Sequence, residues 1–133
     1  MRVGVADTTF ARVDMGALVV EMLLKADKKI EIERSTVPGC KDLAVASKKL
    51  IEEFDCDIVL ALGWVGKEEI DERCAHEANL GLIQAELMTN THILKVFVHE
   101  REQMDEKKLL LLARDRVVKH ALNALALMKG KEE

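Results

Sequence analysis

The stretch Asp57-Ile58-Val59-Leu60-Ala61-Leu62-Gly63 decides the fold, because every residue between its two ends is apolar. A strand with one wet face alternates apolar and polar residues, whereas a strand in the middle of a parallel sheet is apolar on both faces. We therefore expect this stretch to be a central strand with helices packed on both sides of it.

Three further strands are predicted around that stretch, over residues 2–6, 30–37 and 92–99. A helical pattern of apolar residues follows each strand. Two of these patterns are Leu43, Ala46, Leu50 and Phe54, and Ile70, Cys74, Ala78, Leu82 and Ala85. The order βαβαβαβα favours one α/β domain over residues 1–133, with three layers in which a four-stranded parallel sheet has helices on both faces.

The composition excludes several classes of partner. The net charge is -4 and no stripe of Lys or Arg is present, which disfavours binding to nucleic acid. No apolar run approaches the roughly 20 residues that cross a bilayer, so we expect no membrane contact. The acidic Asp7 interrupts the first residues too early for the apolar segment of a signal peptide. The chain has three cysteines, an odd number, which indicates reduced thiols. We expect a cytoplasmic protein.

Four short peptides directly follow the four predicted strands: 7–12, 37–42, 63–67 and 99–101. In an open parallel sheet, ligands bind at the carboxyl ends of the strands. Two of the four aromatic residues of the chain, Phe10 and Trp64, lie in these peptides. The sequence therefore predicts a site that stacks a flat ligand.

The peptides 37–42 and 63–67 each allow two interpretations. Pro38 and Gly39 can open the amides of residues 40–42 to a ligand at a helix N-terminus, or Asp42 can simply cap that helix. The second peptide ends in Gly66-Lys67, but Glu68 follows and the spacing is wrong for a phosphate loop. Trp64 either contacts a ligand or a subunit, or it is buried.

The histidines leave proton transfer open. Cys74 and His76 are two positions apart, about 200° around a helix, so they cannot converge on one metal ion, and no metal site is expected. His76 can still reach a site or a neighbouring subunit. His99 closes the last strand, where it is either a proton-transfer group or a plain polar strand end.

Residues 36–50, Thr-Val-Pro-Gly-Cys-Lys-Asp-Leu-Ala-Val-Ala-Ser-Lys-Lys-Leu, resemble a Val-Pro-Gly stretch of the lumazine synthases, and residues 56–63 resemble the strand that follows it there. Residues 7–15, 74–78 and 96–100 narrow the resemblance to the archaeal-type riboflavin synthases, which are paralogues of lumazine synthase. The similarity extends from about Val3 to Leu127.

That resemblance implies a transferase of riboflavin biosynthesis. Two molecules of 6,7-dimethyl-8-ribityllumazine would dismutate, one giving four carbons to the other, to form riboflavin and 5-amino-6-(ribitylamino)pyrimidinedione. No cofactor is implied, although assistance by a divalent cation stays open. The family also implies a doubly wound, flavodoxin-like fold and a homopentamer whose sites lie between neighbouring subunits and hold two lumazine molecules each.

The resemblance also implies roles for individual residues. Phe10 would stack on the heterocycle, residues 39–42 would hold the ribityl chain, and residues 97–100 would reach the site of the adjacent subunit. We expect His76 and His99 to be the catalytic groups. The expected substrate-binding residues are Thr9, Phe10, Arg12, Pro38, Gly39, Cys40, Lys41, Asp42, Gly63, Trp64, Lys67, Phe97 and Glu100.

One departure separates the two paralogous activities. The proton-transfer histidine of lumazine synthase falls near Ile70, which cannot transfer protons, and the loop from Gly63 to Gly66 is shorter than its counterpart. Riboflavin synthase is therefore favoured over lumazine synthase. A non-catalytic oligomer that binds lumazine or flavin is the third possibility.

Overall fold

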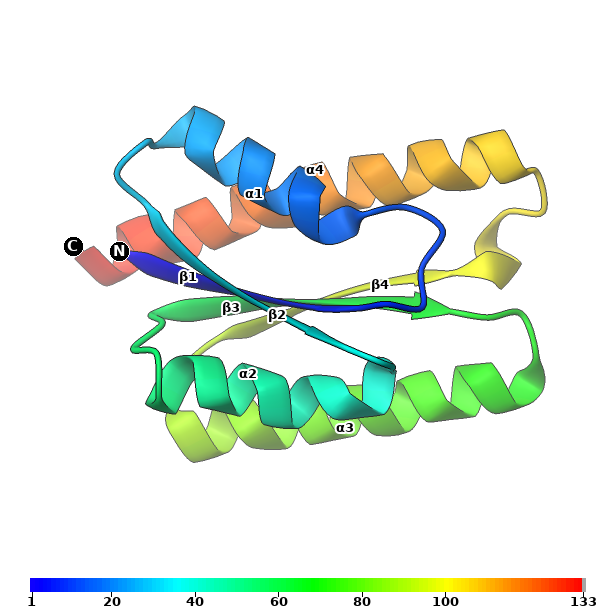
Figure 1. Cartoon of the computed structure of the whole chain (residues 1–133), viewed down its shortest axis with the longest axis horizontal. Helices are drawn as coiled ribbons and strands as arrows, with labels where there is room; N and C mark the ends of the chain where they lie inside the picture. The colour runs from blue at the N-terminus through cyan, green and yellow to red at the C-terminus, as the bar shows by residue number, and fades with distance from the viewer. Residues whose placement is uncertain (133) are drawn as a thin grey trace.

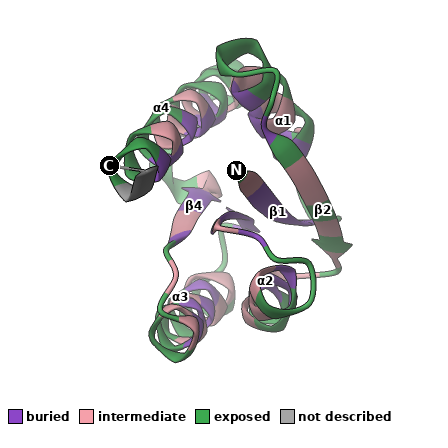
Figure 2. Ribbon diagram, turned by 90° about the vertical axis from the view of Figure 1, so that its left-hand side faces the viewer, coloured by how far each residue is buried: buried purple, intermediate pink, exposed green. Residues whose placement is uncertain are grey.

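The chain forms a four-stranded parallel sheet with two helices on each face, in a computed structural model that describes residues 1–132 (Figure 1). The sheet order is β2-β1-β3-β4. Helices α1 and α4 cover one face, and α2 and α3 cover the other (Figure 2). The predicted three-layer α/β fold is confirmed. The elements are β1 (Arg2–Thr8), α1 (Met15–Ala26), β2 (Glu31–Val37), η1 (Cys40–Asp42), α2 (Leu43–Glu52), β3 (Ile58–Val65), α3 (Glu69–Thr89), β4 (Ile93–His99), η2 (Glu100–Glu102) and α4 (Glu106–Glu132).

Strand β3 is buried along its whole length, as its apolar sequence predicts. It pairs with β1 on one side and with β4 on the other. Successive side chains point to opposite faces of a strand. Leu60, Leu62 and Trp64 accordingly join the core under α1 and α4, whereas Val59 and Ala61 join the core under α2 and α3.

Two strands extend two residues further than the sequence predicts. β1 continues to Thr8, which pairs with Val37, and β3 continues to Val65, which pairs with His99. The prediction ended β3 at Gly63 because glycine commonly marks the end of a strand. The pairing partner on β4 overrides that preference, so Trp64 belongs to the strand and not to the loop.

Two predicted core residues of the helices are exposed. Ile70 is 63% exposed, and Phe54, which lies beyond the end of α2, is 46% exposed. The buried stripe of α3 is Ala75, Ala78, Leu82 and Ala85. The buried stripe alternates steps of three and four residues, which keeps it on one face of the helix. The predicted stripe began with repeated steps of four, and each such step turns the position by about 40° around the helix axis.

No helix within residues 1–132 is both long and apolar enough to cross a membrane.

Gly63 is required by packing and not by a turn. A Cβ atom placed on Gly63 would lie 2.8 Å from two ring carbons of Phe97, the residue opposite it on β4. The Phe97 ring is 7% exposed and belongs to the core under α2 and α3. The absent side chain of Gly63 therefore makes the space in which Phe97 packs.

We expect Gly63→Ala to lower the free energy of unfolding by about 1–3 kcal/mol, because the added methyl group overpacks the Phe97 ring. Gly39→Ala is the matched control. A Cβ atom there meets no atom within 4 Å, so its effect should stay within about 0.5 kcal/mol. Urea unfolding at one chain concentration, followed by the fluorescence of Trp64, measures both. Equal stabilities of the two variants would contradict the Gly63–Phe97 contact.

Candidate functional site

The turns after β1, β2 and β3 enclose a cavity of about 490 Å³ together with the start of α3. The chain leaves β1 for β2 on one side and later forms β3 on the other side. Such a switch point is where ligands bind in open parallel sheets. Seven of the predicted substrate-binding residues line the cavity: Phe10, Pro38, Gly39, Cys40, Lys41, Asp42 and Trp64.

Phe10 is the aromatic ring that borders this cavity from an exposed position. The residue is 55% exposed, in the loop between β1 and α1. The Thr8 hydroxyl donates a hydrogen bond to the Phe10 carbonyl at 2.9 Å, and the Thr9 N–H donates to the Val37 carbonyl at 2.9 Å. An accessible ring on a hydrogen-bonded backbone suits stacking on a planar ligand.

The turn after β2 combines a helix cap with open space. The Asp42 carboxylate accepts the Gly39 N–H at 3.2 Å, and the Gly39 carbonyl accepts the Asp42 N–H at 3.0 Å. The prediction that the Asp42 amide is open to a ligand is therefore wrong, and the capping alternative applies to this residue. The space beside the Cα of Gly39 is unoccupied to 4 Å, so a ligand can approach the backbone there.

Two cysteine side chains form part of the cavity wall. Burial raises the pKa of the Cys40 thiol, which donates to the Trp64 carbonyl at 3.6 Å. Cys74 lines the same cavity from α3. Lys41 is neutralised by Glu77 at 3.1 Å, and both side chains are more than half exposed. The other charged side chains of the lining are the carboxylates of Asp42 and Asp71, so the cavity suits an uncharged heterocycle better than a phosphate group.

A smaller cavity of about 400 Å³ shares Phe10 and Trp64 with the first. Four more predicted residues, from the turns after β1, β3 and β4, line it: Thr9, Arg12, Lys67 and Glu100. Arg12 donates to the Glu100 carboxylate at 3.0 Å, and the Lys67 carbonyl accepts from Arg101 at 2.6 Å. The structure therefore brings eleven of the predicted substrate-binding residues to two cavities that share Phe10 and Trp64.

Trp64 is buried, which is the second of the two interpretations that its sequence position allowed. Trp64 is 1% exposed, and its indole N–H donates to the Glu100 carboxylate at 2.7 Å. Phe97 and Gly63 are likewise occupied with each other in the core and do not line either cavity. Of the two aromatic residues expected to stack a ligand, Phe10 alone is accessible for it.

The two predicted catalytic histidines lie outside both cavities. His76 is exposed on α3. The His99 Nδ1 atom lies 2.7 Å from a Glu72 carboxylate oxygen, and each side chain is 29% exposed. Because an ionised carboxylate only accepts hydrogen bonds, the His99 Nδ1–H donates to Glu72, and Nε2 lies outside this contact. Within residues 1–132, no group of three or more His, Cys, Asp or Glu side chains is arranged to hold a metal ion.

Two residues in the first turns of α3 belong to the site but were not predicted from the sequence. Asp71 lines both cavities and accepts the Glu68 N–H at 3.1 Å, while Glu72 pairs with His99. Both residues follow the turn after β3. The helical start directly after a strand that ends at the site was the signal that could have identified them.

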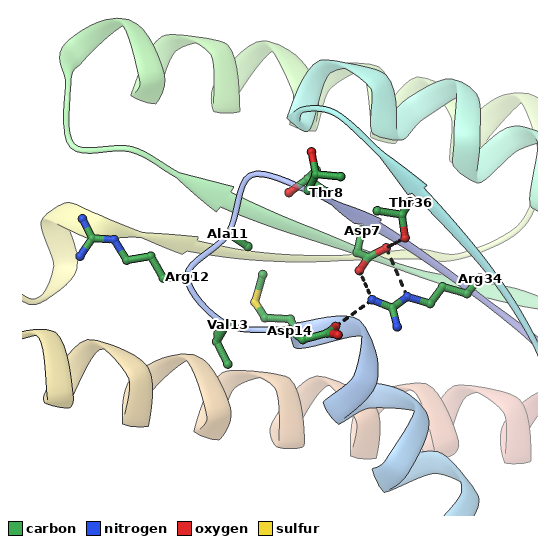
Figure 3. A pocket seen from close by; sticks show the side chains of 10 residues that line it. Asp7, Thr8, Ala11, Arg12, Val13, Asp14, Arg34 and Thr36 are labelled. Atoms are coloured by element: carbon green, nitrogen blue, oxygen red, sulfur yellow. Dashed lines mark hydrogen bonds and ion pairs between the residues drawn. The ribbon is translucent and has the colours of Figure 1, made fainter.

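A charged network on the other side of β1 was also missed. Asp7 is 5% exposed and accepts hydrogen bonds from Arg34 at 2.6 Å and from Thr36 at 2.6 Å (Figure 3). Arg34 also reaches Asp14, whose pKa is lowered first by its helix-cap bond to the Ala17 N–H and then by Arg34. This network borders a third cavity of about 400 Å³ and fixes the start of α1 against β2.

The sequence matches known proteins over nearly its whole length. Residues 1–132 match the model of the 6,7-dimethyl-8-ribityllumazine synthase family. The chain is 56% identical to the riboflavin synthase of Methanothermobacter thermautotrophicus over 96% of this chain and 84% of that protein. It is 47% identical to the riboflavin synthase of Archaeoglobus fulgidus over 96% and 83%, and 45% identical to that of Aeropyrum pernix over 98% and 84%. The chain belongs to the 6,7-dimethyl-8-ribityllumazine synthase family, within the group whose archaeal members are riboflavin synthases.

Proposed function

We propose that this chain is a riboflavin synthase. It converts two molecules of 6,7-dimethyl-8-ribityllumazine into riboflavin and 5-amino-6-(ribitylamino)pyrimidinedione. The archaeal relatives named riboflavin synthase support the activity. The observation in the structure that carries it is the exposed Phe10 ring beside the cavity at the switch point of the sheet.

The reaction makes limited demands on the protein. The 7-methyl group of the lumazine is acidic because its conjugate base is delocalised into the ring. Four carbons pass between two copies of one compound, so we expect no redox cofactor. Holding two reactants in register contributes roughly 7–11 kcal/mol to catalysis, which is the larger part of the task. Phe10 would stack on one bicycle while a ribityl chain lies along the turn of residues 39–42, where the Gly39 and Asp42 amides are already bonded within the turn.

His99 is the better supported of the two proton-transfer candidates. Its Nδ1 contact with Glu72 fixes the ring and leaves Nε2 free for a substrate. His99 is absent from the lining of the cavities in its own subunit, so it would act on the site of a neighbour. His76 is exposed on α3 and needs the same assembly to reach a substrate.

Lumazine synthase activity is the less favoured alternative. The position of its proton-transfer histidine is Ile70, which is 63% exposed on the first turn of α3. That reaction uses a four-carbon ketone phosphate. Of the three cations beside the cavities, Arg12 and Lys41 are already paired with Glu100 and Glu77, and Lys67 borders only the smaller cavity. The missing base at position 70 is therefore the main argument against the older activity.

The outer face of α3 supports assembly into a homopentamer. Leu80, Ile83 and Leu87 follow one another at helical spacing and are 54%, 43% and 79% exposed. A contiguous apolar face on a helix marks an interface between proteins. Burial of this face between neighbours would bring sites and strand ends of adjacent subunits together.

The free cysteines Cys40, Cys56 and Cys74 support a protein that functions in a reducing compartment such as the cytoplasm.

Given only 6,7-dimethyl-8-ribityllumazine, the protein should form riboflavin and the pyrimidinedione in equal amounts, because the substrate is both donor and acceptor. Given the pyrimidinedione and the four-carbon ketone phosphate, it should form little or no lumazine, because Ile70 cannot transfer a proton. Chromatography with fluorescence detection follows both reactions. Efficient lumazine formation without riboflavin would transfer the assignment to the alternative.

Phe10→Ala should lower kcat/KM by about 5- to 150-fold, which corresponds to the loss of about 1–3 kcal/mol of stacking. Phe54→Ala is the matched control, since Phe54 is similarly exposed but follows α2 at the other end of the sheet. Steady-state kinetics on both variants give the comparison. If both variants turn over the lumazine as the wild type does, Phe10 does not stack on the substrate.

Leu87→Glu should dissociate the oligomer, because a charge placed on the outer face of α3 cannot be buried between subunits. Leu122→Glu, at a 56% exposed position on α4, should leave the oligomer intact. Light scattering should give a mass near five chains for the wild type and the control. A wild-type protein that is monomeric and fully active would refute the shared-site model.

A further inference from the structure

Three side chains form a continuous set of contacts beneath the Phe10 loop (residues 9–14). The Trp64 indole N–H donates to Glu100 Oε2 at 2.7 Å, and Arg12 donates to Glu100 Oε1 at 3.0 Å. Each oxygen of the carboxylate therefore has its own donor. We call Trp64, Glu100 and Arg12 the Glu100 cluster. It joins β3, the end of β4 and the Phe10 loop, which are far apart in the sequence.

Burial makes this arrangement more than a surface ion pair. The Glu100 side chain is 10% exposed, and Trp64 is 1% exposed. Removing a carboxylate from water is unfavourable unless donors replace the lost water. The rigid indole fixes Glu100, and Glu100 in turn fixes the guanidinium of Arg12, which is half exposed. Charge-assisted hydrogen bonds of this kind are stronger than neutral ones.

The other contacts of the loop hold its two ends. Thr8 and Thr9 hold its first residues through backbone carbonyls, and its end is held by the Asp14 cap of α1 and by Val13, which packs against the core under α1 and α4. Between them, the Arg12 guanidinium reaches Glu100 at 3.0 Å and, less closely, Glu106 of α4 at 4.0 Å. Figure 3 shows Arg12 extending away from the Asp7 network, so that network does not hold it.

We propose that the Glu100 cluster positions Phe10 for stacking, and that Arg12, Glu100 and Trp64 act through this ring without binding substrate themselves. The proposal rests on the proposed function, because it assigns these residues a role in the same site. Arg12 lies two residues from Phe10, and both line the smaller cavity. The Glu100 carboxylate, which attracts Arg12, already accepts a hydrogen bond from the buried Trp64 indole, so its position is fixed before any ligand binds.

A double-mutant cycle separates positioning from direct contact. Arg12→Ala should weaken binding of 6,7-dimethyl-8-ribityllumazine by about five- to tenfold, because the competent loop conformation becomes a minor one. In a Phe10→Ala background, the same Arg12→Ala change should weaken binding by less than about twofold. Effects that multiply in the double variant would show that Arg12 touches the substrate, and no effect of Arg12→Ala alone would show that it does not position Phe10. Either result overturns the proposal.

Two controls separate positioning from a loss of structure. Arg114→Ala, an exposed arginine on α4, should bind lumazine as the wild type does. Trp64 is the only tryptophan of the chain, so its emission reports directly on the core below Glu100. Arg12→Ala should leave that emission and the melting temperature unchanged. Arg12→Lys, which retains a charge that can reach Glu100, should recover part of the affinity.

A measurement without ligand distinguishes failure of this proposal from failure of the proposed function. Arg12→Ala should speed amide hydrogen exchange in residues 9–13 by about five- to tenfold, while exchange in β3 and β4 stays unchanged. This result is expected whether or not the wild type makes riboflavin. Unchanged exchange in the Phe10 loop overturns the proposal, whereas a wild type that makes no riboflavin but shows the exchange difference overturns only the assigned activity.

Discussion

The burial of β3 on both faces is the constraint on which the rest of the structure depends. Its side chains enter two separate cores, so helices have to cover both sides of the sheet. The right-handed crossovers that this requires place β2 on one side of β1 and β3 on the other. The switch point that follows gathers three turns around one cavity. The site is thus a consequence of how one apolar strand is covered.

The last residues of β3 support the site in two different ways. Gly63 leaves room for Phe97 on one face, and Trp64 reaches Glu100 on the other. Gly63 lies outside both cavities, and Trp64 borders them from a buried position. The exposed Phe10 ring, the turn at Gly39, two cysteines and the Asp71 carboxylate complete the lining. A fixed surface of this kind suits a reaction in which two flat molecules have to be held in register.

Local pattern was sufficient to predict the element order, the parallel sheet and the grouping of the turns, because each depends on residues close together in the chain. It was insufficient for Trp64, whose partner Glu100 lies 36 positions away and becomes a neighbour only when β4 pairs with β3. The Asp7–Arg34 pair, 27 positions apart, was missed for the same reason. Gly63 was wrongly predicted to end the strand, because the sequence does not distinguish a glycine that makes room for an aromatic ring, here that of Phe97, from a glycine in a turn. A site that lies between subunits also depends on contacts between chains, which the periodicity of one sequence does not reveal.

The most direct test of this account is a crystal structure of the protein with a ribityllumazine that lacks the reactive 7-methyl group. The account predicts that the bicyclic ring lies against Phe10 at about 3.5–4 Å, the normal separation of carbon atoms in contact, with its ribityl chain along residues 39–42. Density for the ring in the cavity beside Asp7 and Arg34, with Phe10 free of ligand, would contradict it.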